Sequence, residues 1–226
     1  KITDMKEHPD DLSVEEILIR SSNVGSVILA KKIGEERFKE FIKKTKLTKN
    51  PNIELEEVGR PHQFKWNRCK LETISFGHGI TTTPLQATAL YASITNGGKL
   101  INPSLVKNRK IQELNSIISK DTSNQLRKIL RKVVSSKIGT ASLADKDGYY
   151  VGGKTGTAES YGDKKNRINT FISVFPSNKP NYTLFVMLEN PKINRDLIYN
   201  YRGIKTKAPY NTSGWNSVYV AGKIIE

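Results

Sequence analysis

Apolar side chains recur at helical spacing through much of residues 13–136. The clearest stripe predicts a helix over residues 122–136, because its members lie on one face of a 3.6-residue period. These members are Leu126, Ile129, Leu130, Val133 and Val134. Ser13 and Glu16 have the spacing of a capping box, which predicts a short helix over residues 14–20. The first part of the chain is therefore predicted to be mainly helical.

Three further helices follow from the same kinds of signal. Apolar stripes predict helices over residues 24–33 and 35–44. Thr83 can cap a helix that carries Pro84 at its first position and ends near Thr95. Residues 48–72, in contrast, show no clear period and are interrupted by Asn50-Pro51-Asn52 and Gly59-Arg60-Pro61, so a loop-rich excursion is predicted there.

The period changes from helical to alternating near residue 149. Three strands are predicted, over residues 149–159, 169–175 and 182–189. Gly162-Asp163 and residues 177–180 are turn-forming stretches between them, so neighbouring strands are predicted to pair antiparallel.

The last part of the chain is predicted to hold a loop and a helix. Residues 191–210 are polar and irregular, which predicts an exposed loop. Thr212 and Ser213 can cap a final helix over residues 214–225. Helices, then a meander of strands, then a terminal helix favour a mixed α/β fold of the α+β kind. An antiparallel sheet would be flanked by helices on both faces.

Composition narrows the class of protein. The chain has 226 residues and 36% hydrophobic content, which suits one globular domain, or one with a small lobe. No apolar run approaches the roughly 18 residues of a membrane-spanning helix. The chain starts at Lys1 and not at Met, so we expect it to be part of a longer protein that carries any membrane anchor elsewhere.

The net charge of +15 has two interpretations. It could mark a polyanion-binding module, such as one that binds nucleic acid. It could also be a solvated, lysine-rich surface. The second is favoured because the lysines are scattered and no aromatic residues interleave with them as a stacking platform for bases would require. No nucleic-acid partner is expected.

Metal and disulfide chemistry find little support in the sequence. Cys69 is the only cysteine, so no disulfide forms within the chain. His8, His62 and His78 do not join Cys69 at any metal-ligand spacing. Neither a metal site nor a cofactor is expected.

The stretch Val151–Ser160, VGGKTGTAES, is the first candidate site. On an edge strand, Thr155 and Thr157 would share one face while Lys154 and Gly156 point to the other. Two hydroxyls and nearby N–H groups could bind a carboxylate, and small residues would leave room for a ligand along the strand. The alternative is an ordinary hairpin strand with a surface lysine.

Ser21-Ser22-Asn23 is the second candidate. A hydroxyl and an amide two residues apart could present a proton relay together with a group that binds a carbonyl. The alternative is a helix cap, for which Ser and Asn are preferred residues. Both roles are compatible if Ser22 or Asn23 caps the helix while Ser21 faces a cleft.

Six segments in fixed order decide between these alternatives. They are SSN at 21–23, SFGHG at 75–79, TPLQ at 83–86, NGG at 96–98, KTGTAE at 154–159 and the closing GWNSVYVAGKIIE. Together they resemble the transpeptidase domain of class B penicillin-binding proteins, whose superfamily uses S-x-x-K, an S-x-N type motif and K-T-G. The resemblance extends over essentially the whole chain and implies a serine β-lactamase/D,D-transpeptidase-like fold.

The resemblance also implies a role for each candidate residue. Ser21 would relay a proton to the leaving amine, and Lys154 would hydrogen-bond near it as the second catalytic group. Asn23 would bind the amide of the acyl donor. Thr155, Gly156 and Thr157 would form the strand that binds the substrate, with the two threonines holding its terminal carboxylate. Thr157 N–H would supply half of an oxyanion hole.

The family further implies a setting for this chemistry. Its members cross-link peptidoglycan stem peptides through a serine acyl-enzyme without a cofactor, and β-lactams mimic the donor. They are anchored in the cell inner membrane with the catalytic domain facing the periplasm, and they join division or elongation proteins in building the cell wall and shaping the cell.

One motif departs from the pattern. The family's nucleophile lies in an S-x-x-K motif that precedes S-x-N, and nothing before Ser21 matches it. The only S-x-x-K runs from Ser104 to Lys107, after Ser21, which is the wrong order. We therefore expect residues 1–226 to be the C-terminal part of one transpeptidase domain, inactive alone. A carboxypeptidase, β-lactamase or β-lactam sensor of the same superfamily remains an alternative, as does a non-catalytic basic binding module.

Overall fold

The computed structural model describes residues 1–63, 65–67, 70–107, 115–159 and 166–226. The chain forms two compact units. The first comprises Lys1–Leu18 and Ser22–Asn124, and the second comprises Ile19–Ser21 and Gln125–Glu226. The expectations for Cys69, Ser160 and the Gly162-Asp163 turn lie outside the described residues.

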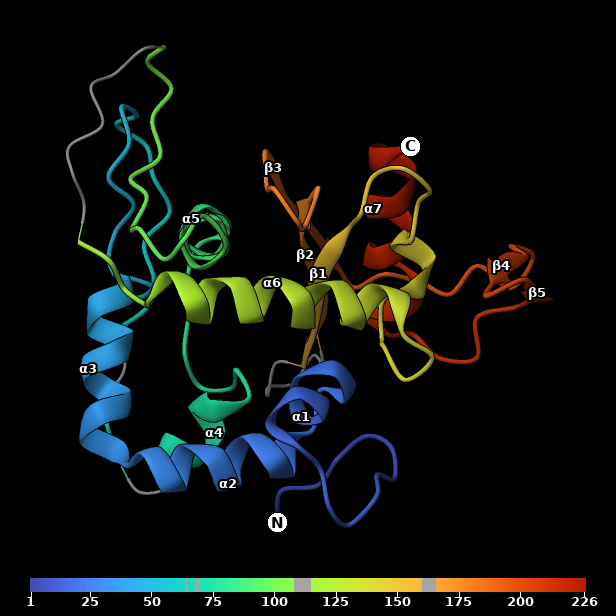
Figure 1. The fold of residues 1–226 in the computed structure, drawn as a ribbon, viewed down its shortest axis with the longest axis horizontal. Helices are drawn as coiled ribbons and strands as arrows, with labels where there is room; N and C mark the ends of the chain where they lie inside the picture. Colours follow the sequence, from blue (N-terminus) through green and yellow to red (C-terminus); the bar gives the residue numbers. More distant parts are fainter. Residues whose placement is uncertain (64, 68–69, 108–114, 160–165) are drawn as a thin grey trace. The chain divides into compact units, whose positions relative to one another are not determined.

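Helices make up most of the first unit (Figure 1). They are α1 (Val14–Arg20), α2 (Asn23–Ile33), α3 (Glu35–Thr45), α4 (Lys70–Ser75) and α5 (Pro84–Thr95), followed by the start of α6 (Lys120–Ser135). Five of these six helices were predicted to within about two residues at each end. Local caps explain this agreement: Glu16 N–H donates to Ser13 Oγ at 3.2 Å, and Gln86 N–H donates to Thr83 Oγ1 at 3.1 Å.

Helix α4 was not predicted, since the sequence indicated a loop-rich stretch there. It has six residues, and Ile74 is its one buried residue. A helix this short cannot display a hydrophobic period, so the sequence carries no amphipathic signal for it. Beyond it the chain turns through Gly77 and Gly79, which have φ values of 92° and 70° and adopt left-handed conformations that glycine allows.

The second unit is built on a three-stranded antiparallel sheet in the order β1-β2-β3. The strands are β1 (Gly152–Glu159), β2 (Arg167–Phe175) and β3 (Tyr182–Glu189). Thr155 pairs with Phe171, which in turn pairs with Val186. The predicted strands, their antiparallel pairing and the edge position of β1 are confirmed.

Helices cover both faces of this sheet, as predicted. Phe171 and Val186 lie on one face and join a buried core that includes Val218 and Ala221 of α7 (Ser217–Ile225). Gly152 points to the opposite face because side chains alternate along a strand. A Cβ atom on Gly152 would lie 3.1 Å from the backbone nitrogen of Arg131 in α6. The second half of α6 therefore packs against that face.

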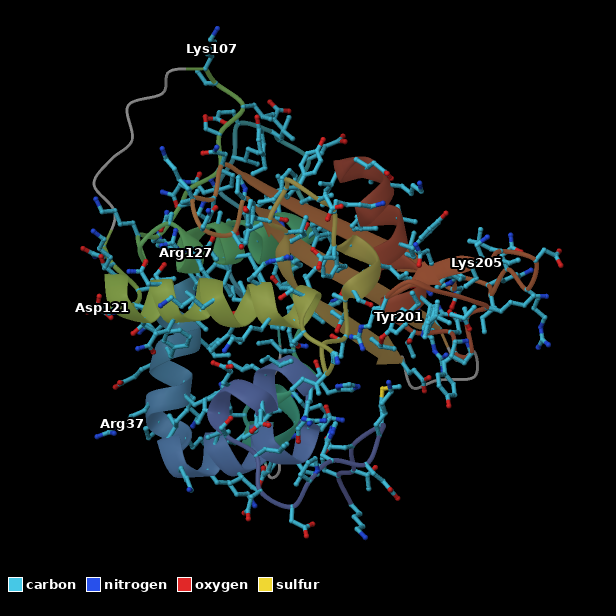
Figure 2. The ribbon with its side chains drawn as sticks, turned by 45° about the vertical axis from the view of Figure 1, so that its right-hand side comes forward. Arg37, Lys107, Asp121, Arg127, Tyr201 and Lys205 are labelled. Carbon is cyan, nitrogen blue, oxygen red and sulfur yellow. The ribbon has the colours of Figure 1, made fainter. Side chains whose placement is uncertain are left out.

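Residues 191–210 contain a hairpin in place of the predicted exposed loop. Strand β4 (Tyr199–Tyr201) pairs antiparallel with β5 (Ile204–Thr206). The two turn residues, Arg202 and Gly203, both have positive φ (55° and 82°), as a tight two-residue hairpin turn requires. Figure 1 shows this hairpin apart from the three-stranded sheet, and Figure 2 labels Tyr201 and Lys205 on it.

Aromatic packing joins the hairpin to the region before α7. The Tyr201 ring stacks on Trp215 with centroids 4.8 Å apart, and Tyr199 meets Trp215 edge-on at 5.5 Å. Ser213–Trp215 is a short 3-10 turn, and Asn216 caps α7 by accepting the Ser217 N–H. The expectation that Thr212 and Ser213 cap a helix from residue 214 was therefore wrong, because the chain makes this separate turn first.

We expect Gly153→Ala to destabilise the second unit. A Cβ atom at this position would lie 2.6 Å from the Ile172 carbonyl oxygen and 2.6 Å from Cζ of the buried Phe171. Relief of this overlap requires the core to shift, which costs about 1–3 kcal/mol. Denaturant unfolding of the variant should show this loss. Gly59→Ala is the control, because its Cβ would meet only Thr83 at 3.7 Å. Equal stability of the two variants would contradict the packing described for Gly153.

Candidate active site

Ser21 is placed by the residue two positions before it. Ile19 is 2% exposed and belongs to the core of the second unit together with Val133 and Val134. Ser21 itself has φ 60°, a left-handed conformation that is uncommon for residues other than glycine. This conformation ends α1 sharply and turns the Ser21 side chain out of the helical path.

Lys154 meets Ser21 across 133 residues of sequence. Lys154 Nζ donates hydrogen bonds to Ser21 Oγ and, at 3.1 Å, to the Thr155 carbonyl oxygen. Burial lowers the pKa of Lys154 from 10.5 to about 8, because the low-dielectric surroundings disfavour its charged form. A lysine poised near neutral pH beside a hydroxyl can accept or return a proton through that hydroxyl.

Ser22 performs the capping role that the sequence left open. Its Oγ accepts the Gly25 N–H at 2.9 Å and donates to Asp4 Oδ2 at 2.9 Å. Ser22 is buried, whereas Ser21 and Asn23 are half-buried. Ser22 therefore caps α2, and Ser21 is left to accept a hydrogen bond from Lys154.

Asn23 is the first residue of α2 and belongs to the first unit. Its Nδ2 donates to the Thr3 carbonyl oxygen at 3.1 Å, and its backbone N–H donates to the Asp4 carboxylate. Thr3 and Asp4 therefore orient this residue, and no motif in the sequence pointed to either. The binding of a donor amide by Asn23 stays a prediction.

Thr155 and Thr157 share one face of β1, as predicted, and both are half-buried. Thr155 Oγ1 lies 2.9 Å from Thr140 Oγ1, and Thr157 Oγ1 lies 2.8 Å from Ser213 Oγ. Thr140 and Ser213 had no predicted role here. Each hydroxyl expected to hold a carboxylate is thus bonded to a second hydroxyl, from the half-buried Thr140 or from the buried Ser213.

The glycines of the stretch serve the protein's own packing. The prediction that small residues let a ligand lie along the strand stays a prediction, and at Gly153 and Gly156 the position of a Cβ atom is taken by neighbouring residues. A Cβ on Gly156 would lie 2.5 Å from Thr170 Oγ1, and the space beside Gly153 is filled by Phe171. Larger residues are excluded at both positions by neighbours within the sheet.

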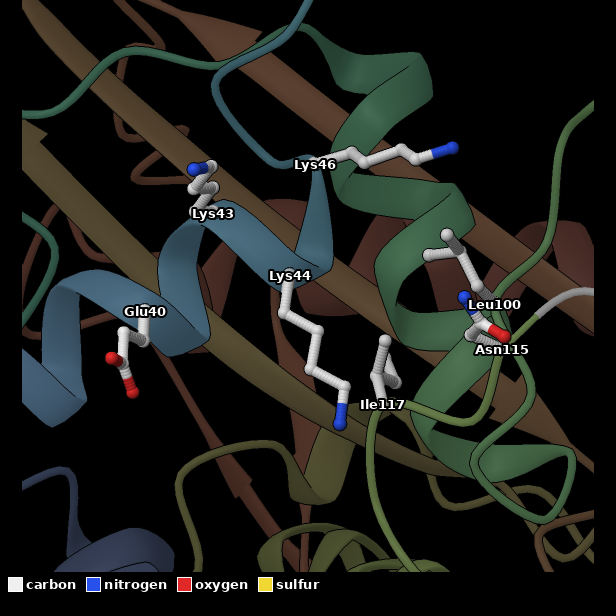
Figure 3. Close-up of a pocket in the computed structure, with 7 residues that line it drawn as sticks. All are labelled: Glu40, Lys43, Lys44, Lys46, Leu100, Asn115 and Ile117. Atoms are coloured by element: carbon white, nitrogen blue, oxygen red, sulfur yellow. The ribbon is translucent and has the colours of Figure 1, made fainter.

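A pocket of about 430 Å³ in the first unit contains none of the predicted site residues (Figure 3). It is lined by Glu40, Lys43, Lys44, Lys46, Leu100, Asn115 and Ile117. Figure 3 shows the three lysine side chains pointing in different directions, so they do not converge on one point.

Within the described ranges, no three His, Cys, Asp or Glu side chains gather as a metal site would require. In that same part of the chain, no helix is long and apolar enough to cross a membrane.

A half-buried lysine on an edge strand, bonded to the serine of an S-x-N motif, fits the penicillin-recognising class that the motifs resemble. The family model described as "Penicillin binding protein transpeptidase domain" matches residues 1–212. The chain belongs to this family, which confirms the resemblance and the fold class. Family membership favours the transpeptidase interpretation over a non-catalytic basic module.

Individual relatives agree with this assignment. The chain is 31% identical to the "Probable peptidoglycan D,D-transpeptidase FtsI" of Caulobacter vibrioides, over 95% of this chain and 37% of the relative. It is 33% identical to the "Stage V sporulation protein D" of Bacillus subtilis, over 78% of this chain and 30% of the relative. The chain therefore spans about a third of the curated relatives it matches.

Solved structures of other penicillin-binding proteins share the fold. Penicillin-binding protein 3 of Mycobacterium tuberculosis, complexed with aztreonam, aligns with a TM-score of 0.82 over 99% of this chain and 53% of its own, at 24% identity. The transpeptidase domain of Burkholderia pseudomallei penicillin-binding protein 3 aligns with a TM-score of 0.77 over 95% of this chain and 63% of its own, at 23% identity.

We expect the free energy of unfolding of the wild type, relative to Lys154→Met, to rise between about pH 8 and pH 10.5. In this window the folded protein has released the Lys154 proton and the unfolded chain still holds it, because burial lowers the folded-state pKa from 10.5 to about 8. Below pH 8 both states hold the proton, and the destabilising effect of burial is fully present. The slope reaches at most about 1.4 kcal/mol per pH unit.

Denaturant unfolding at a series of pH values measures this slope. Lys179→Met, on the exposed turn between β2 and β3, is the matched control and should give a curve parallel to that of the wild type. A flat difference between wild type and Lys154→Met from pH 8 to pH 10 would contradict the burial of the Lys154 ammonium group.

Proposed function

We propose that this chain is the C-terminal part of the catalytic domain of a peptidoglycan D,D-transpeptidase. The observation that carries the proposal is the contact between Lys154 Nζ and Ser21 Oγ beside the edge strand β1. Relatives named as peptidoglycan D,D-transpeptidases support the choice of reaction. The substrate would be the D-alanyl-D-alanine end of a stem peptide.

The reaction proceeds through two acyl transfers. A serine oxygen attacks the carbonyl carbon of the penultimate D-alanine, and the bond to the nitrogen of the terminal D-alanine breaks. Ser21 passes a proton to that nitrogen, so the terminal D-alanine leaves as an amine. An amine from a neighbouring stem peptide then attacks the ester and restores the serine hydroxyl.

Lys154 sustains the proton relay through Ser21. With its pKa lowered to about 8, the lysine can exchange a proton with Ser21 at neutral pH, and its positive form stabilises negative charge that develops nearby. Thr155 and Thr157 hold the terminal carboxylate, and Gly156 adds no side chain to the strand between them. Asn23 binds the donor amide. The open edge of β1 suits an extended peptide.

The nucleophile in this proposal comes from an S-x-x-K segment ahead of Ser21. Ser104, in the only S-x-x-K of the sequence, has a local structural role: its Oγ donates to Glu54 Oε1 at 2.6 Å and accepts the Val106 N–H at 3.1 Å. Glu54 Oε2 also accepts the Leu105 N–H at 3.0 Å. These bonds engage the Ser104 hydroxyl with partners of the first unit, whereas Ser21 and Lys154 belong to the second.

The surroundings of the enzyme are part of the same proposal. The domain faces the periplasm from the cell inner membrane, where it meets stem peptides and division or elongation proteins. β-Lactams would bind along β1 as donor mimics. Solved complexes of the M. tuberculosis penicillin-binding protein 3 with aztreonam and with ampicillin support this, because that protein shares the fold.

Fluorescent penicillin tests the proposal directly. In a protein that carries an S-x-x-K serine ahead of Ser21, the wild type should be labelled covalently. Ser21→Ala and Lys154→Ala should each lower the labelling rate by roughly 100-fold or more, because each breaks the proton relay. The 226-residue chain alone should not be labelled. In-gel fluorescence with time gives the rates.

Ser104→Ala is the matched control and should be labelled at the wild-type rate. Labelling of the 226-residue chain at Ser104 would contradict the position proposed for the nucleophile. Wild-type labelling rates in Ser21→Ala and Lys154→Ala would remove the roles assigned to that pair.

A further inference from the structure

Ser213 makes contacts that the proposed function does not use. It lies in the 3-10 turn before α7 and is 1% exposed. Its Oγ donates to the Gly156 carbonyl oxygen and lies 2.8 Å from Thr157 Oγ1. Its backbone N–H also donates to Thr157 Oγ1 at 3.3 Å. A buried serine thus meets two consecutive residues of the strand that is proposed to bind substrate.

Proton counting fixes the direction of these bonds. A serine hydroxyl carries one proton, and a carbonyl oxygen can only accept. Because Ser213 donates its proton to Gly156, the bond between Ser213 and Thr157 must use the proton of Thr157. In this state the Thr157 proton points into the interior and is not available to a ligand.

A carboxylate also only accepts hydrogen bonds, so Thr157 must turn its proton outward to hold one. We propose that Ser213 is a positioning residue that reorients with the ligand. Its hydroxyl donates to Gly156 when the strand is empty and to Thr157 when a carboxylate is bound. Thr157 then donates to the carboxylate while it accepts from Ser213, and each bond polarises the next. This inference rests on the proposed function.

The surroundings allow this exchange with no unpaired group left behind. The Gly156 carbonyl oxygen also accepts from Thr170 Oγ1 at 3.3 Å, so it keeps a donor when Ser213 turns away. The turn that carries Ser213 is held in place, since the Ser213 carbonyl oxygen accepts from Ser217 Oγ at 3.2 Å and Trp215 stacks on Tyr201. The exchange turns the Ser213 hydroxyl from the Gly156 carbonyl oxygen toward Thr157 Oγ1.

The test compares two probes on the 226-residue chain. The first probe, N-acetyl-D-alanyl-D-alanine, ends in a carboxylate. The second is the same dipeptide with a C-terminal amide in place of the carboxylate. Binding is followed by NMR titration of the backbone amides of β1. We expect the wild type to prefer the carboxylate probe and Ser213→Ala to lower that preference by roughly 3- to 10-fold, the effect of one lost hydrogen bond. Affinity for the amide probe should not change.

A double-mutant cycle isolates the contact. In a Thr157→Val background, adding Ser213→Ala should change the carboxylate preference by less than twofold. Ser173→Ala is the matched control, because Ser173 is also a buried serine of the second unit and bonds to Leu184 at the far side of β2. The Ser173→Ala variant should prefer the carboxylate probe over the amide probe as strongly as the wild type does. Thermal unfolding of each variant checks that it is folded.

Each outcome is decisive. If the wild type prefers the carboxylate and Ser213→Ala keeps the full preference, the inference fails and the proposed function stands. If Ser213→Ala binds the carboxylate more tightly, Ser213 only competes for the Thr157 proton, and the inference also fails. If the wild type does not distinguish the probes, the carboxylate site itself is wrong, and Ser213 has no such role.

Discussion

The burial of Ile19 is the constraint on which the candidate site depends. This residue joins the core formed by α6, α7 and the sheet, and full burial of an isoleucine contributes about 1.5–3 kcal/mol. Ser21 follows two residues later, in a left-handed conformation that ends the helix. The position of its hydroxyl is therefore set by apolar packing. The contact with Lys154 would be lost if that packing loosened.

The second constraint is the desolvation of Lys154. Burial disfavours its ammonium form, which lowers the stability of the folded protein at neutral pH and at the same time brings the pKa into the range useful for proton transfer. Lys154 lies on a strand with glycine at positions 153 and 156, where a Cβ atom would overlap neighbouring residues of the sheet. In the segment from Gly153 to Gly156, the glycines are needed for packing and Lys154 supplies the group that transfers the proton.

The sequence predicted those parts of the fold whose causes are local. Capping residues such as Ser13 and Thr83, and the apolar stripe of α6, mark helices within a few residues of chain. Helix α4 is too short for a period, and the packing of the β4–β5 hairpin on Trp215 has no local signature in the sequence. Both were missed for that reason.

The candidate site divides in the same way. The pairing of Ser21 with Lys154 came from the order of motifs, since no local pattern joins residues 133 positions apart. Thr140 and Ser213 were missed because a single polar residue behind a strand has no signature in the sequence. Only the folded structure shows that their hydroxyls lie 2.9 Å and 2.8 Å from those of Thr155 and Thr157.

Desolvation beside Ser21 lowers the pKa of Lys154 to about 8. An NMR titration of the Lys154 side-chain ¹³Cε resonance, assigned by its loss in Lys154→Arg, measures this pKa directly. We expect a midpoint near pH 8, together with a change in the resonance in Ser21→Ala. A midpoint near 10.5, the value of a solvated lysine, would contradict the desolvation of Lys154.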